Sequence, residues 1–219
     1  MALANDSIDV TPGTGATVAT HLVSSKEYQV VMVAGPSGHI EGSLATYMLA
    51  IPPIAMGASK LMWDLHNGSA SNVIKVRGVW VVPAYDVAVT GVIAVRFDFF
   101  RTSSAGTGGT AAVYNSTAVA TTPSIVPKDT NNAALPSGVG ARQSPTGGAA
   151  SAAWAFHTYH VQEETSAWAG TSQFNNVMPN PERGEQEFTL RPGEGFKCVQ
   201  GTVAGVAQNV GFLATFTVE

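Results

Sequence analysis

Alternating apolar and polar residues are clearest between residues 72 and 101, and this stretch is the predicted centre of the fold. Side chains on a strand point to opposite faces in turn, so the alternation predicts a pair of half-buried strands. Pro83 cannot donate a ladder hydrogen bond and should end the first strand or lie on an edge. Lys75 and Arg77 lie on the polar parity of the first strand. The apolar parity consists of Ile74, Val76, Trp80 and Val82 in the first strand and of Val95, Phe97 and Phe99 in the second.

Further strands are predicted at residues 28–34, 61–66, 152–162, 186–190, 196–200 and 210–218. Residues 44–51 are compatible with a short helix, which Pro52 and Pro53 would stop. The turn at residues 191–195 should place Gly193 or Gly195 at positive φ. The whole pattern predicts an all-β protein, an antiparallel two-sheet sandwich of the jelly-roll type. Its predicted core includes Ile74, Val76, Trp80, Val95, Phe97, Phe212 and Phe216.

The predicted organisation is an extended N-terminal arm at residues 1–20 and a sandwich domain at residues 21–219. Residues 102–150 are rich in Ser, Thr, Gly and Ala and are predicted to form a loop insertion, either mobile or ordered against a neighbouring subunit. The arm carries too few apolar residues to fold alone, and we expect it to add to the sheet edge of a neighbour. The candidate intersubunit contacts are Ile8, Val10 and Val18 in the arm and Ile125 and Val126 in the loop.

Charged residues make up only 12% of the chain, about half the usual share. The formal net charge of −4 argues against a broad basic surface for nucleic acid. The sequence contains no apolar run of the ~20 residues that cross a bilayer, and residues 1–6 lack the features of a signal peptide. Cys198 is the only cysteine, so we expect no intrachain disulfide, a buried thiol that shares parity with Phe196, and synthesis in the cytoplasm.

Candidate chemistry is sparse along the chain. His157 and His160 are three residues apart, which on a strand points them to opposite faces and prevents a shared metal ion. Asp64 and His66 share a parity, but no third ligand is visible near them. The acidic residues beside the loops are expected to be solvated charges rather than a catalytic pair. We therefore predict no catalytic residues, no cofactor and no metal.

Three passages carry a resemblance to a known family: residues 8–19 with the strand at 28–33, residues 61–68 leading to 73–77, and residues 188–196 with the strand that follows. Together they resemble small β-sandwich structural proteins from the particles of tailed bacteriophages. The resemblance covers about half of the chain and rests on strand-and-turn patterns. It does not extend to residues 102–150.

The resemblance implies a non-enzymatic virion protein made in the cytoplasm of the host bacterium. Related sandwiches decorate capsids, sit on tails or form host-contacting tips, so a capsid decoration or cement protein is the favoured hypothesis. The alternative is a tail, baseplate or appendage component that contacts host surface glycans, and a glycan depolymerase ranks third. The expected partners are other copies of the chain, with a trimer favoured, and virion proteins such as the major capsid protein; no nucleic acid or membrane is expected.

Overall fold

The computed structural model describes residues 19–23, 26–30, 44–84, 93–118, 121–132, 134–148, 150–162, 178, 187–201 and 209–219. The chain divides into two units, Met1–Ser43 and Leu44–Glu219. Regular secondary structure in the described residues is entirely β, which confirms the predicted fold class.

The first unit contains a β-hairpin. Strand β1 (Ala19–Val23) pairs antiparallel with β2 (Lys26–Val30), with Ala19 opposite Val30. The predicted arm boundary after residue 20 falls within β1, and the strand predicted at residues 28–34 overlaps the end of β2. Ile8, Val10 and Val18 lie outside the described residues, so their predicted contacts stay predictions.

The second unit is a sandwich of two six-stranded sheets. The sheet with the order β12-β5-β14-β3-β9-β8 is called the first sheet below, and the sheet with the order β11-β6-β13-β4-β10-β7 is called the second. The first comprises β12 (Phe188–Leu190), β5 (Ile74–Pro83), β14 (Asn209–Val218), β3 (Ala45–Ala55), β9 (Ser124–Pro127) and β8 (Val113–Tyr114). The second comprises β11 (Ala150–Gln162), β6 (Ile93–Thr102), β13 (Gly195–Gln200), β4 (Leu61–Asn67), β10 (Val139–Gln143) and β7 (Thr110–Ala111).

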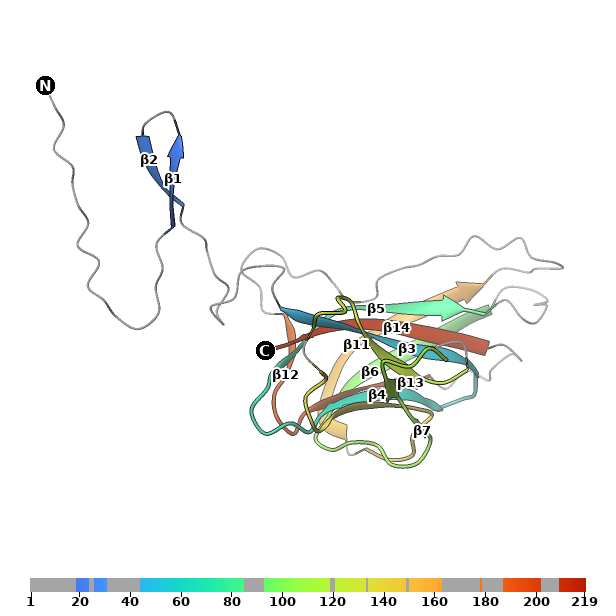
Figure 1. Ribbon diagram of the computed structural model, residues 1–219. Helices are drawn as coiled ribbons and strands as arrows, with labels where there is room; N and C mark the ends of the chain where they lie inside the picture. The colour runs from blue at the N-terminus through green and yellow to red at the C-terminus, as the bar shows by residue number, and fades with distance from the viewer. Residues whose placement is uncertain are drawn as a thin grey trace, which may run out of the picture. The chain divides into compact units, whose positions relative to one another are not determined.

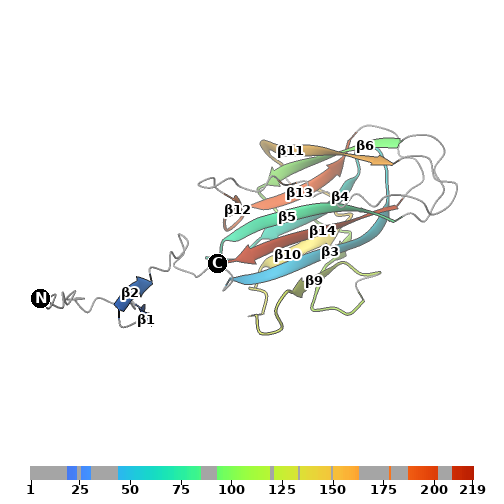
Figure 2. The ribbon, with the colours of Figure 1, turned by 90° about the horizontal axis from the view of Figure 1, so that it is seen from above.

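Strand pairing in this unit follows the pattern of a rolled-up hairpin. The strands β3, β4, β5 and β6 pair antiparallel with β14, β13, β12 and β11, in that reversed order. Rolling this long hairpin brings β14 beside β5 and β13 beside β6, and successive strands then alternate between the two sheets. This is the topology of a jelly roll. Figure 1 shows the two layers, and Figure 2 shows β12, β5, β14, β3 and β9 side by side in the first sheet.

Aromatic side chains from both sheets meet in the core. Trp63 of β4 lies between Phe99, Phe196 and Phe212, with ring centroids 5.6–6.3 Å apart. Phe97 meets Phe212 edge to face at 5.3 Å. All the predicted core residues are buried except Trp80, which is half-buried; the confirmed ones are Ile74, Val76, Val95, Phe97, Phe212 and Phe216.

Trp80 lies outside the core because the register between β5 and β14 shifts by one residue. Thr215 pairs with Gly78 but Phe216 pairs with Val76, so Arg77 is an extra residue on β5. A one-residue shift moves every later side chain to the opposite face. Val79 and Val81 therefore enter the core, and Trp80 and Val82 do not.

Three predicted elements differ in the structure. Strands β5 and β6 belong to different sheets, so the predicted central pair is one strand from each layer. Residues 45–55 form strand β3 rather than a helix, and Pro52 and Pro53 are included where the register with β14 shifts. Residues 102–150 contain four strands, β7 to β10, which extend both sheets beyond β3 and β4; the loop prediction is wrong there.

The turn before β13 matches its prediction. Gly193 has φ of 82°, where a side chain would be penalised. The turn is fixed by its own contacts, since Glu194 accepts a hydrogen bond from the Arg191 N–H (2.8 Å).

Candidate functional site

The outer surface of the first sheet carries a set of half-buried apolar side chains, which we call the apolar face. Leu213 of β14 lies opposite Trp80 on β5 and opposite Ala50 on β3. In the next row, Met48 of β3 lies opposite Val126 of β9. Directly opposed residues share a face, and Leu213 alternates with the buried Phe212, so this set points away from the core. The apolar face consists of Met48, Ala50, Trp80, Val126 and Leu213.

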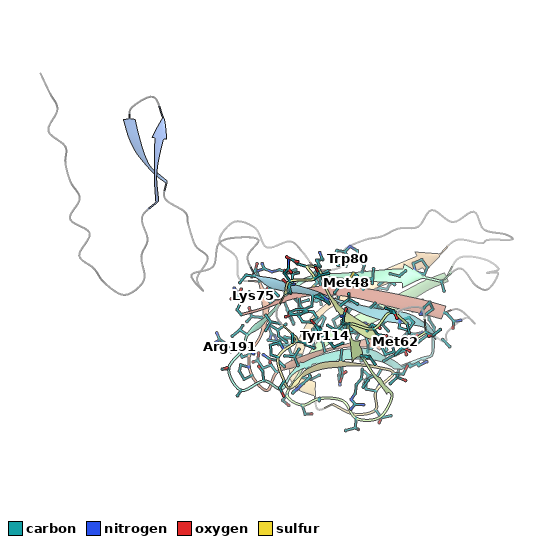
Figure 3. All side chains as sticks on the ribbon, viewed as in Figure 1. Met48, Met62, Lys75, Trp80, Tyr114 and Arg191 are labelled. Carbon is teal, nitrogen blue, oxygen red and sulfur yellow. The ribbon has the colours of Figure 1, made fainter. Side chains whose placement is uncertain are left out.

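The Trp80 ring on this face lies where a side chain on residue 78 would be, and Gly78 leaves that space open. A Cβ on Gly78 would lie 2.9 Å and 3.0 Å from the Trp80 ring atoms Cζ3 and Cζ2 and closer still to Cη2. The indole therefore lies directly over the Gly78 backbone, where only hydrogen fits. Figure 3 labels Trp80 and Met48 on this side of the sandwich.

An ionic cluster borders the apolar face where β5 begins. Lys75 contacts Glu219 (Nζ–Oε1 2.8 Å) and Glu187 (3.7 Å), and Arg77 also pairs with Glu187. All four side chains are less than 35% exposed. The cluster ties edge strand β12 to β5, and it places the charges of this sheet beside the apolar residues rather than among them.

The outer surface of the second sheet carries polar side chains over β4, β10 and β13, and loops of this unit contact them. Asp64 of β4 is only 4% exposed, and its Oδ2 accepts a hydrogen bond from the Gly106 N–H (2.7 Å). Burial raises the pKa of Asp64 above its ordinary value, although hydrogen bonds from backbone N–H groups act in the opposite direction. Arg142 and Lys197 donate to the carbonyl oxygens of Gly108 (2.9 Å) and Gly148 (3.0 Å). The loops that contain Gly106, Gly108 and Gly148 are thus fastened to β4, β10 and β13.

Asp64 and His66 lie on one face of β4, opposite Arg142 and Gly140 of β10. The His66 Nε2 atom is buried and has no hydrogen-bond partner among the described residues. Within the described ranges, no group of three or more His, Cys, Asp or Glu is placed to hold a metal ion.

A second polar cluster lies on β6 and β11. Arg96 donates from Nε to Asp98 Oδ1 (2.8 Å), and Tyr159 lies opposite Arg96 on β11. Tyr159 is 58% exposed and meets His157 edge to face, with ring centroids 5.6 Å apart. In the regular pairing of β11 with β6, His157 lies opposite Asp98 and His160 lies opposite Val95. The two histidines are therefore three residues apart on an unbroken strand, as the prediction against a shared metal ion assumed.

The two loop residues predicted to contact another subunit lie in different environments. Ile125 is 1% exposed and belongs to the core, so its side chain does not lie on the surface where a contact with another subunit would need it. Val126 is half-buried on the apolar face. Cys198 is fully buried as predicted, and burial raises the pKa of its thiol well above the ordinary value.

Comparison of the chain with protein-family models, with curated proteins and with solved structures finds no match. Among the described residues, no helix is long and apolar enough to cross a membrane.

Proposed function

We propose that this chain is a non-enzymatic structural protein of a bacteriophage particle, most simply a capsid decoration or cement protein. It would stabilise the particle through contacts between subunits. The observation that carries the proposal is the apolar face, with Trp80 opposite Leu213 on the outside of the first sheet.

The composition of the apolar face suits a contact surface. Interface centres are depleted in charged residues, and Trp is among the residues that contribute most to binding. The charges of the first sheet are gathered in the cluster around Lys75 and Glu187 at one end. A partner that covers Trp80 and Leu213 would therefore bury apolar area without burying those ions.

The fold and the resemblance support the same proposal. Jelly rolls build viral capsid proteins, but they also build lectins and cupins, so the fold alone does not decide the function. The phage assignment comes from the three passages quoted above. Two of them come together in the sandwich, because β13 pairs with β4 and places Gly195 opposite His66.

The partners implied by the proposal are other copies of the chain, with a trimer favoured, and the major capsid protein. Sedimentation of the purified chain tests the first part. A trimer is the expected result, and a monomer that persists at high protein concentration would contradict self-assembly.

The experiment that tests the function locates the chain on intact phage particles. We expect cryo-electron microscopy of particles carrying a tagged copy to show the tag on the outer capsid surface. Density on the tail or baseplate would replace cementing with the second candidate, a tail or appendage component that contacts host glycans. Particles that assemble with the tagged chain present but exclude it would contradict the whole proposal.

A further inference from the structure

One edge of the sandwich is closed by a short segment that belongs to both sheets. Strand β7 borders the second sheet and β8 borders the first, and each is two residues long. The chain passes between them at Ala112, whose N–H donates to the Ala141 carbonyl oxygen (2.8 Å). Short edge strands present few unpaired backbone groups to another chain.

The opposite edge carries β12, with three residues, and β11, with 13 residues. In the part of the chain that the structure describes, no strand pairs with the far side of β11, which runs along the border of this unit in Figure 2. After an irregularity near Trp154, β11 pairs with β6 without interruption from Phe156 to Gln162.

This regular stretch of β11 lacks most of the sequence features that protect an edge strand from pairing with another chain. Residues 156–162 include no Lys, Arg, Asp, Glu or Pro, which are the residues that discourage strand addition. Tyr159 is 58% exposed beside the Arg96–Asp98 pair. Tyr and Arg are enriched among the residues that dominate binding energy. This edge is therefore suited to receive a strand.

The first unit supplies strands that need a sheet. Among the described residues, β1 and β2 pair only with each other. A two-stranded hairpin in water is at best marginally stable by itself. Addition to the edge of a longer sheet would satisfy one outer row of its backbone N–H and C=O groups.

We propose that the β1–β2 hairpin of one copy pairs with β11 of a second copy and extends the second sheet of that neighbour. The inference rests on the proposed structural function, since it takes the chain to assemble with itself. The residues between Val30 and Leu44 can span up to roughly 40 Å when extended, which is enough to reach a neighbouring subunit. Head-to-tail contacts of this kind generate rings when the rotation closes, in keeping with the favoured trimer.

The test uses single-cysteine variants of the full chain and a short bis-maleimide cross-linker. His157→Cys marks the exposed face of β11, and Thr20→Cys and Gln29→Cys mark β1 and β2. The native Cys198 is fully buried, so it should remain unreacted, and the unsubstituted chain checks this. The β11 variant is labelled with ¹⁵N and mixed with each hairpin variant, so that mass identifies products joining two different copies. Tyr159→Cys serves as a second β11 variant, and Thr110→Cys on β7 is the matched control at the closed edge.

The expected result is a product that joins His157→Cys to at least one hairpin variant, at a yield about tenfold above the Thr110→Cys control. Products that join only two β11 variants would show self-pairing of β11 and overturn the inference. The inference is also overturned if the mixtures give no product above the control. It is overturned as well if a variant that carries both cysteines in one chain cross-links internally while the mixtures of single variants do not. The purified chain is sufficient for this test, so a chain that attaches to particles without this cross-link would contradict the inference and leave the proposed function standing.

Discussion

The two sheets share one core but differ in their outer surfaces. The first sheet presents Trp80, Leu213 and Met48 outwards and keeps its ion pairs at one end. The second sheet places Asp64 under the Gly106 turn and fastens its loops with Arg142 and Lys197. On the second sheet, loops of the same unit therefore cover Asp64 and engage Arg142 and Lys197, whereas the apolar face of the first sheet gains most from a partner.

Asp64 on the second sheet and the apolar residues of the first sheet also differ in what they contact. Asp64 is the most buried acidic side chain among the described residues, and its carboxylate accepts a hydrogen bond from the Gly106 N–H and holds a loop. The side chains suited to binding are instead apolar. The structural role that we propose therefore rests on the first sheet.

The largest expected effect is on the free energy of unfolding, and it distinguishes the core face of β14 from its outer, apolar face. Phe212→Ala removes a ring that contacts Trp63 and Phe97, and we expect it to lower the free energy of unfolding by ~3–5 kcal/mol. The matched control is Leu213→Ala, the next residue on the outer surface, with an expected loss below about 1.5 kcal/mol because its site is already half-exposed. Urea unfolding measures both, and equal losses would contradict the assignment of the two faces.

A smaller effect is expected from Gly78→Ala. The new methyl group would collide with the Trp80 indole, and we expect a loss of about 1–3 kcal/mol from the forced displacement. In the Trp80→Ala background the same substitution should cost much less, because the obstacle is gone. A double-mutant cycle by urea unfolding measures this coupling, and additive losses would show that Trp80 does not lie over Gly78.

The smallest effect concerns pH and the second sheet. Burial raises the pKa of Asp64 above 3.8, so the folded chain holds this proton more tightly than the unfolded chain does. The resulting stability is fully present below the unfolded pKa and is lost as pH rises through the folded pKa. Asp64→Asn keeps an oxygen for the Gly106 N–H but removes the titration.

Urea unfolding of the unsubstituted chain and of Asp64→Asn, from about pH 3 to pH 7, checks this prediction. The difference between their free energies of unfolding isolates Asp64, because the other carboxylates contribute equally to both proteins. The stability of the unsubstituted chain relative to Asp64→Asn should fall as pH rises and then become constant. A rise over the same range would mean that the hydrogen bonds to Asp64 outweigh its burial.

The alternating pattern predicted most of the sandwich because strands with one buried face must alternate. Val95, Phe97, Phe212 and Phe216 are buried for this reason. The face of Trp80 was mispredicted because alternation is read from an unbroken strand, and the extra residue Arg77 reverses it. Gly78, a glycine within a strand, is the signal that could have revealed the bulge.

The sequence pattern does not predict the strands between residues 102 and 150, because they are short and are stabilised mainly by pairing with neighbouring strands. Strand β9 has four residues and pairs with β3, and it buries Ile125 in a core formed by other strands. The apolar face could not be predicted for a related reason, since Met48, Trp80 and Leu213 are far apart in sequence. Pairing of β3, β5 and β14 assembles them, and no local pattern encodes that pairing.

The central claim, that the apolar face attaches the chain to its particle, is tested most directly by measuring binding of purified variants to particles that lack the chain. Trp80→Ala should weaken binding by about 2 kcal/mol or more, roughly 30-fold, as expected for a central aromatic contact. Arg142→Ala on the second sheet should leave binding unchanged, and near-ultraviolet circular dichroism should confirm that both variants are folded. Full binding by the folded Trp80→Ala variant, or an equal loss for Arg142→Ala, would contradict the account.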